Sequence, residues 1–145
     1  MNKVIYIMFI GVISCGKLSI DLTGLHTCEA TIIGDTDDAI AIYAPTIKLC
    51  GQETIIALEK FEFRDTLGKA HFKIMDTIKI NLLNDQILRL AFCNDWKTQN
   101  IILVTDETDN NFGEILKPWS YNENRTKLVE IDPTNLDCLN RDLMD

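Results

Sequence analysis

The chain contains few of the side chains on which catalysis and metal binding usually depend. Among 145 residues it has two histidines, His26 and His71, which are not spaced like metal ligands. No two cysteines have the C-x-x-C spacing of a zinc site, and the motifs of phosphate-binding loops, serine hydrolases, zinc proteases and dinucleotide-binding folds are missing. The sequence therefore predicts a protein that is not an enzyme, with no catalytic residue, no metal site and no cofactor.

Basic side chains are scarce relative to acidic ones. The chain has 14 Lys and Arg against 22 Asp and Glu, and its formal net charge is −8. This balance argues against nucleic-acid binding, which depends on neutralising phosphates, and against a polybasic contact with a membrane surface. An acidic surface steers basic molecules toward itself, so a protein partner recognised through overall charge is expected to be basic.

The chain also lacks a membrane-spanning run, because the apolar stretch Val4–Ile13 is shorter than the roughly 20 residues that a span requires. This stretch follows Lys3 and has the length of a signal-peptide hydrophobic region. Its end, Val12-Ile13-Ser14-Cys15, resembles the lipobox of bacterial lipoproteins, in which a small residue precedes a cysteine. The resemblance implies that residues 1–14 are removed and that Cys15 carries fatty acyl chains such as palmitate.

The same resemblance implies a location in the cell envelope, on a membrane reached through the lipid anchor. Residues 15–27 would then form a lipidated tether, and residues 28–145 a single domain of ordinary size. Gly16, rather than Asp, follows the cysteine, which favours the outer membrane if the source is Gram-negative.

Four cysteines remain once Cys15 is assigned to lipid, an even number in a chain expected to be exported. Such a set predicts a disulfide framework, with buried free thiols as the alternative. Four cysteines allow three pairings, between which the sequence does not choose. Our working prediction is Cys28–Cys50 and Cys93–Cys138, the second of which would tie the C-terminal segment to the body.

Alternation of apolar and polar residues predicts β-strands in the body of the chain. Residues 60–64 and 71–74 alternate on either side of a turn, so Phe61 and Phe63 are expected on one face, against Phe72. Residues 77–82 and 87–93 predict a second hairpin by the same pattern, and residues 46–50 a further strand. The continuous apolar run Asn100–Val104 predicts a strand covered on both faces.

A short α-helix is expected at the C-terminus. Asp132 has the position of an N-cap and Pro133 that of the first helical residue, and the leucines beyond them are spaced as one helical stripe. The predicted fold is mainly β, a small antiparallel β-sandwich or curled sheet of about seven to nine strands with this one helix.

One loop, residues 117–126, combines residue types that anchor interfaces. Its candidate partner-binding residues are Trp119, Tyr121, Asn122 and Arg125. The alternative is that Trp119 and Tyr121 close one end of the sandwich.

Two acidic loops invite comparison with calcium sites, which need six to eight oxygen ligands at defined spacing. Neither loop fits the EF-hand pattern, so we expect solvated turns instead. The acidic residues are Asp35, Asp37 and Asp38 in one loop, and Asp106, Glu107 and Asp109 in the other.

The function expected from these features is that of a membrane-anchored, non-catalytic protein-binding module of the cell envelope, of an immunity, inhibitor or exclusion type. One alternative is a structural or assembly subunit of an envelope complex. A second is a hydrolase that uses scattered carboxylates, whose distances a sequence does not supply.

Overall fold

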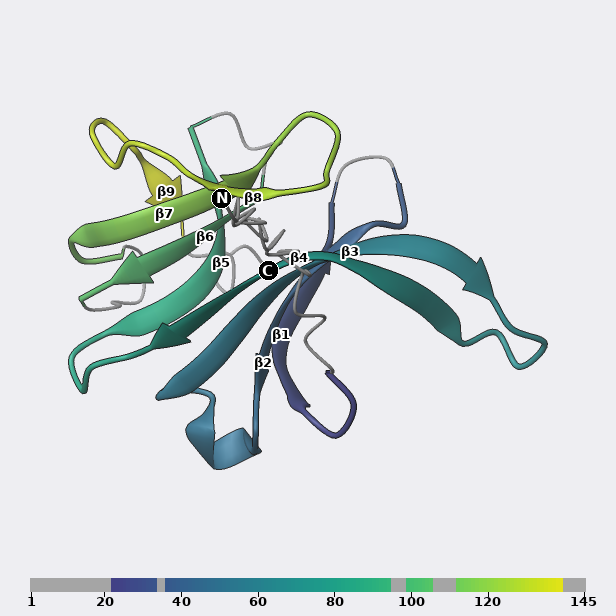
Figure 1. Ribbon diagram of the computed structural model, residues 1–145. Coiled ribbons are helices and arrows are strands. Elements are labelled where there is room, and N and C mark those ends of the chain that lie inside the picture. Colours follow the sequence, from purple (N-terminus) through teal and green to yellow (C-terminus); the bar gives the residue numbers. More distant parts are fainter. Residues whose placement is uncertain (1–21, 34–35, 95–98, 106–111, 140–145) are drawn as a thin grey trace, which may run out of the picture.

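The computed structural model describes residues 22–33, 36–94, 99–105 and 112–139. No helix within these residues is long and apolar enough to cross a membrane. Strands dominate the described chain (Figure 1). They are β1 (His26–Ile32), β2 (Ala39–Ala44), β3 (Glu53–Arg64), β4 (Ala70–Asn81), β5 (Ile87–Cys93), β6 (Gln99–Val104), β7 (Ile115–Tyr121), β8 (Leu128–Glu130) and β9 (Cys138–Leu139), with one 3-10 helix, η1 (Ile47–Leu49).

The strands form two antiparallel sheets. Sheet A has the order β1-β2-β3-β4, and sheet B has the order β8-β7-β6-β5-β9. Side chains of both sheets meet in one apolar core, so the two sheets form a sandwich. The predicted mainly β, antiparallel fold is confirmed, and its nine described strands lie within the expected range.

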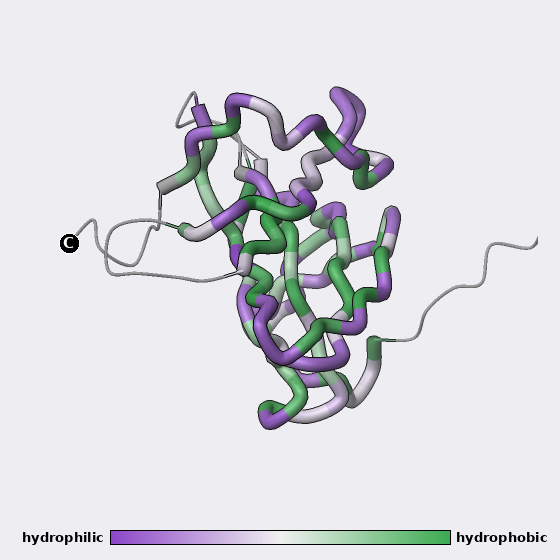
Figure 2. Tube along the Cα trace, turned by 90° about the vertical axis from the view of Figure 1, so that its left-hand side faces the viewer, coloured by the Kyte–Doolittle hydropathy of each residue, from purple (hydrophilic) through white to green (hydrophobic). Residues whose placement is uncertain are grey.

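Successive side chains of a strand point to opposite faces, so every second residue of the inner strands reaches the space between the sheets. Many residues of the strands in the body are apolar and are drawn in green in Figure 2. In β2, Ile40 and Ile42 point between the sheets and are at most 2% exposed. Leu90 and Ile101 of sheet B belong to the same buried cluster. Burying one such side chain stabilises the fold by about 1.5–3 kcal/mol.

Strand β6 is covered on both faces, as its continuous apolar run predicts. Ile101 and Leu103 belong to the core between the sheets, whereas Ile102 and Val104 belong to a second cluster on the other face of sheet B. Cys138 also packs in this second cluster, so the C-terminal segment helps to cover sheet B.

Acidic side chains bridge the two sheets at opposite edges. Glu29 of β1 accepts a hydrogen bond at Oε2 from the backbone N–H of Leu90, at 3.4 Å. Asp76 of β4 accepts one at Oδ2 from the backbone N–H of Leu128, at 2.8 Å. These carboxylates satisfy backbone groups that no neighbouring strand reaches.

Both predicted disulfides are present. Cys28 of β1 is bonded to Cys50, which follows η1, and Cys93 of β5 is bonded to Cys138 of β9. Cys93 and Cys138 are direct register partners in sheet B. The second bridge therefore fixes the C-terminal segment to the sandwich.

The predicted hairpin between residues 77–82 and 87–93 is wrong. β4 pairs with β3, and β5 pairs with β6, so these neighbouring segments belong to different sheets. Alternation identifies the inward face of a strand but not its partner, and both segments do turn apolar side chains to the shared core. Residues 46–50 also differ from prediction, because they contain η1 and a turn rather than a strand.

The predicted C-terminal helix is not found in residues 132–139. Asp132 Oδ1 accepts a hydrogen bond from Thr134 N at 2.8 Å, which closes a local turn rather than capping a helix. Asn135 has φ +63°, a left-handed conformation that interrupts a right-handed helix. Cys138 then enters β9, and residues 140–145 lie outside the described part. β1 begins at His26, within the last residues of the predicted tether, and residues 15–21 of that tether lie outside the described part.

Candidate functional site

The predicted binding residues on residues 117–126 do not form an exposed patch. Residues up to Tyr121 belong to strand β7 rather than to a loop. Trp119 is 5% exposed and lies in the core, and Tyr121 packs partly against it. Their positions agree with the alternative that these two aromatic side chains fill the sandwich.

Asn122 and Arg125 shape a turn at the end of β7. Asn122 Oδ1 accepts hydrogen bonds from the backbone N–H groups of Thr126 and Lys127, at 2.8 and 3.0 Å. Arg125 Nη1 donates to Thr36 Oγ1 at 2.6 Å and lies 3.5 Å from Asp38 Oδ2. Both side chains are thus engaged in internal contacts that connect this turn to the β1–β2 connection.

The part of the chain that the structure describes contains no cluster of three or more side chains suited to a metal ion. Asp38, one of the acidic residues considered for calcium, accepts a hydrogen bond from Phe61 N at 3.0 Å and pairs with Arg125. Asp35 and the second acidic set (Asp106, Glu107 and Asp109) lie outside the described residues.

Glu59 and Tyr43 lie next to each other on the outer face of sheet A, and the pKa of each is raised above its ordinary value. Glu59 is 7% exposed, and Tyr43 Oη donates a hydrogen bond to its Oε1 at 2.5 Å. Burial raises the pKa of Glu59, against the opposing effect of the Tyr43 hydrogen bond. Burial, followed by the Glu59 carboxylate, raises the pKa of Tyr43. The recess of about 320 Å³ beside them is lined by no second carboxyl, so it lacks the pair that glycoside hydrolysis uses.

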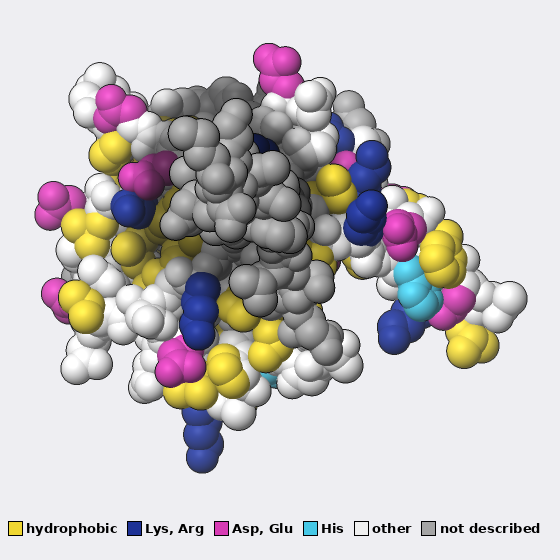
Figure 3. Space-filling view, viewed as in Figure 1, with side chains coloured by type: hydrophobic (Ala, Val, Ile, Leu, Met, Phe, Trp, Pro, Cys, Tyr) yellow, Lys and Arg dark blue, Asp and Glu magenta, His cyan; other side chains and the backbone are white. Residues whose placement is uncertain are grey.

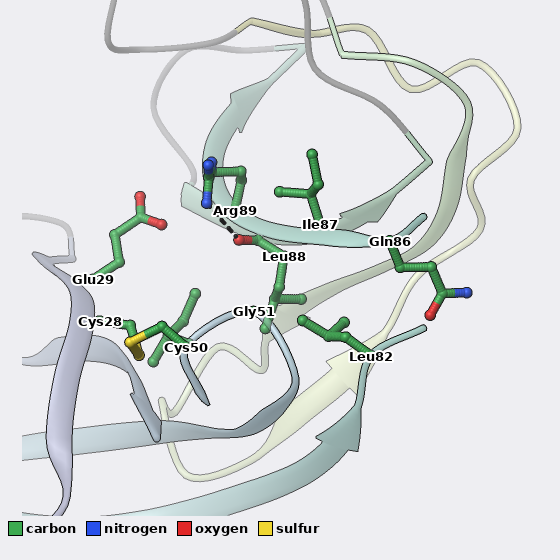
Figure 4. A pocket seen from close by; sticks show the side chains of 10 residues that line it. Cys28, Glu29, Cys50, Gly51, Leu82, Gln86, Ile87, Leu88 and Arg89 are labelled. Atoms are coloured by element: carbon green, nitrogen blue, oxygen red, sulfur yellow. Dashed lines mark hydrogen bonds between the residues drawn. A yellow bond between two sulfur atoms is a disulfide. The ribbon is translucent and has the colours of Figure 1, made fainter. Parts of the chain in front are cut away.

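A cleft of about 360 Å³ opens between the start of β5 and the Cys28–Cys50 disulfide (Figure 4). Its sulfur atoms are bonded to each other and offer no thiolate nucleophile. Glu29 at its rim is hydrogen-bonded to the backbone of sheet B, and Arg89 Nη1 donates to Leu88 O at 3.3 Å. The polar groups of this cleft therefore serve the structure of its walls.

A projecting arm, residues 60–73, is formed by the ends of two long strands. Strands β3 and β4 have 12 residues each, whereas β2 has 6. The last register pair of β2 with β3 is Ala39 with Glu59, so the two long strands continue beyond it as a two-stranded ribbon. Figure 1 shows this ribbon extending well past the other strands.

A β-bulge between Phe61 and Phe63 gives the arm two different faces. Phe61 pairs with Phe72, and Phe63 pairs with His71. Because His71 and Phe72 are consecutive in β4, they point to opposite faces. The prediction that Phe61 and Phe63 share one face is therefore wrong, since the extra bulge residue reverses the alternation. The ring centroids of Phe63 and His71 are 4.6 Å apart and stacked, and those of Phe61 and Phe72 are 5.9 Å apart, edge to face.

The tip of the arm is a well-bonded turn. Asp65 Oδ1 accepts hydrogen bonds from the backbone N–H groups of Leu67 and Lys69, both at 2.9 Å, and Oδ2 lies 3.1 Å from His71 Nε2. The His71 hydrogen bond, and then the Lys69 N–H, lower the pKa of Asp65. Gly68 has φ +80°, which favours glycine at this position.

The arm is exposed, apolar in part and basic. Leu67 is 92% exposed and Phe63 is 52% exposed. The arm holds four basic and two acidic residues, in a chain with a formal charge of −8. Figure 3 shows these hydrophobic, basic and His side chains gathered away from the main body. Exposed apolar groups beside charged ones are typical of interaction surfaces.

Comparison of the chain with protein-family models, curated proteins and solved structures gives no match. The geometry of the arm, the disulfides and the N-terminal sequence pattern are therefore the basis for assigning a function.

Proposed function

We propose that the protein is a lipid-anchored, non-catalytic binding module of the bacterial cell envelope that presents the projecting arm to another protein. The observation that carries this proposal is the exposure of Phe63 and Leu67 on a ribbon that extends from a disulfide-bonded domain. The lipobox-like sequence that ends at Cys15 supports the anchor. Two disulfides fit an oxidising compartment such as the envelope.

The strand register supports an arm directed away from an N-terminal anchor. At the start of β1, His26 pairs with Ala44, next to η1. At the other end of β2, Ala39 pairs with Glu59 at the base of the arm. The arm tip therefore lies beyond the end of sheet A opposite to His26, and β3 alone spans about 30 Å from Ile55 to Arg64. A lipid attached before β1 leaves the tip free for a partner in solution or on a neighbouring complex.

The second candidate is a structural subunit that accepts a strand from a neighbour. The specific observation in its favour is β4, a 12-residue strand at the edge of sheet A in the described chain. Edge strands of this length present backbone groups to which another strand can pair. The arm includes the first third of this edge strand, residues 70–73, so the two candidates place the partner near the same part of the molecule.

Site-specific photo-crosslinking in cells that make the protein naturally tests the proposal. A photoreactive amino acid replaces Leu67 at the arm tip, and in a matched control it replaces Lys48, which is exposed on η1 at the far end of sheet A. We expect a discrete protein adduct from position 67 and none from position 48. Cys15→Ser removes the sulfur that would carry the lipid and is expected to yield a protein without acyl groups. No adduct at position 67, or the same adduct at both positions, would contradict the proposal.

A further inference from the structure

We infer that the arm recognises an acidic protein segment that also carries an apolar side chain; this inference rests on the proposed binding function. The contact is made by the cationic face of the arm, which we define as Lys60, Phe63, His71 and Lys73. The overall acidity of the chain favours a basic partner, whereas the positive charge of this local surface favours an acidic one.

Lys60 and Lys73 are direct cross-strand partners in the arm. Both side chains are exposed, and neither forms a salt bridge with any residue that the structure describes. Like charges directly opposite each other in an antiparallel pair destabilise a sheet. A carboxylate from a partner, placed between the two ammonium groups, would replace this repulsion by attraction.

The apolar part of the cationic face lies next to the two lysines. His71 and Lys73 alternate along β4, so they point to the same face as their partners Phe63 and Lys60. The Phe63 ring is stacked on His71 and remains half exposed. An aromatic surface beside paired cations suits a segment in which acidic and apolar residues alternate.

On the other face of the arm, the cationic side chain of Arg64 contacts an aromatic ring of the arm itself. The Arg64 guanidinium lies 5.7 Å from the centroid of the Phe61 ring, and Phe72 packs against the same ring. Phe72 also lines the recess next to Glu59 on the outer side of sheet A. The cationic face therefore combines unpaired charge and exposed aromatic surface in a way that the opposite face does not.

Charge and position favour a protein partner over nucleic acid or lipid. Binding of a nucleic acid depends on many Lys and Arg side chains that neutralise its phosphates. The arm holds only four such side chains, and the chain as a whole, with a formal charge of −8, would repel the phosphate backbone. The arm extends from the end of sheet A opposite to His26, the first residue of β1, and the proposed anchor precedes β1 in the sequence.

Peptide binding to the full-length, lipid-modified protein in detergent tests the inference. Three fluorescent peptides serve as probes: one of alternating glutamate and leucine, one of glutamate and serine, and one of lysine and leucine. Fluorescence polarisation is expected to show the strongest binding for glutamate–leucine, weaker binding for glutamate–serine and none for lysine–leucine. Equal binding of the lysine–leucine peptide would overturn the inference.

Charge-reversal variants locate the binding. In Lys60→Glu/Lys73→Glu the affinity for the glutamate–leucine peptide is expected to fall by at least about tenfold. The matched control Lys48→Glu/Lys127→Glu makes the same change of charge at exposed positions outside the arm, and its affinity is expected to stay within about twofold of wild type. An unchanged affinity in the arm variant would refute the inference.

A neutral variant separates a binding role from a structural one. Lys60→Gln/Lys73→Gln removes the repulsion across the strands, so its melting temperature is expected to equal or exceed that of wild type while its peptide affinity falls. If stability and affinity fall together, the lysines support the fold rather than a partner, and the inference fails.

Three further results identify a different occupant. Sedimentation showing self-association that Lys60→Glu/Lys73→Glu abolishes would replace the separate partner by a second copy. Crosslinks from position 67 to phosphatidylglycerol in nanodiscs, without peptide binding, would replace it by lipid. A protein adduct from position 67 in cells, without binding of the glutamate–leucine peptide, would leave the proposed function standing and overturn only the acidic chemistry of the partner.

Discussion

Glu59 is a buried carboxyl whose charge the fold disfavours. Burial raises the pKa of Glu59 above its value in the unfolded chain, so the native state binds the carboxyl proton more tightly. The stability that this difference contributes is present at acid pH and is lost as the pH rises through the native pKa. Glu59→Gln keeps an acceptor for Tyr43 Oη and never ionises. The variant is therefore expected to gain stability relative to wild type as the pH rises from about 4 to about 8.

Urea unfolding across this pH range checks the prediction, with Glu62→Gln as the matched control at an exposed position two residues after Lys60. The difference between Glu59→Gln and wild type should widen toward neutral pH, whereas the control should show no such trend. A difference that is constant with pH, or that narrows, would show that the Glu59 carboxyl is not penalised by burial.

Asp76 connects β4 to sheet B through a single side chain. Its Oδ2 accepts from the N–H of Leu128, and its Oδ1 accepts from the N–H of Thr77 at 3.0 Å. Leu128 is 9% exposed, and Asp76→Ala leaves its N–H without this acceptor. The substitution is therefore expected to lower the free energy of unfolding by about 1–3 kcal/mol.

The free energy of unfolding in urea measures the effect of Asp76→Ala. Asp85→Ala, in the exposed turn that follows Leu83, is the control and should change stability by no more than about 0.5 kcal/mol. Equal effects of the two variants would contradict the inter-sheet role of Asp76.

At the scale of elements, the two disulfides hold segments that strand pairing alone secures weakly. β9 has two residues, and Cys93–Cys138 is the covalent link between it and β5. The bridges span 22 and 45 residues. In the chain-entropy model these separations correspond to about 3.4 and about 4.0 kcal/mol, with the longer loop stabilised more.

Replacing each pair of cysteines by alanine, followed by urea unfolding, tests this ranking. Both variants are expected to lose several kcal/mol, and Cys93→Ala/Cys138→Ala slightly more than Cys28→Ala/Cys50→Ala. A loss of less than about 1 kcal/mol for the longer bridge would mean that β9 is held by packing alone.

Local sequence predicts the strands of this protein better than their partners. Alternation located β5, the last part of β3 (residues 60–64) and most of β4 (residues 71–74 and 77–82), because successive side chains of a strand point to opposite faces. It did not show that the two β4 segments form one strand. It did not show that β4 and β5 lie in different sheets, since an inward face is the same for either arrangement. The predicted C-terminal helix failed because Asp132 bonds within a turn and Cys138 is fixed to Cys93 by a contact distant in sequence.

The candidate site was less accessible to prediction than the fold. Trp119 and Arg125 have the residue types of an interface, yet tertiary contacts bury the first and pair the second with Asp38. In the sequence, the lysines and phenylalanines of the arm have the alternating pattern of any amphipathic strand pair, which does not mark them as a binding surface. Only the length of β3 and β4 beyond β2, and the bulge after Phe61, show that this pair projects into solvent with a cationic face.

At the scale of the whole molecule, charge is divided unevenly. The chain is acidic, but the arm holds four basic residues against two acidic ones. Overall charge describes how the whole protein steers other molecules, whereas the proposed binding at the tip would depend on the charges of the arm itself. An anchor before β1 and an arm at the opposite end would give the molecule a membrane end and a partner end.

The intact mass of the membrane-extracted protein, measured with and without reduction, tests this account most directly. The expected species has lost residues 1–14, carries acyl groups on Cys15 and takes up the hydrogens of two disulfides on reduction. Cys15→Ser should retain both disulfides and lose the acyl mass. A membrane-extracted protein with the unmodified mass of residues 1–145 would contradict the lipid anchor, and with it the proposed orientation of the arm.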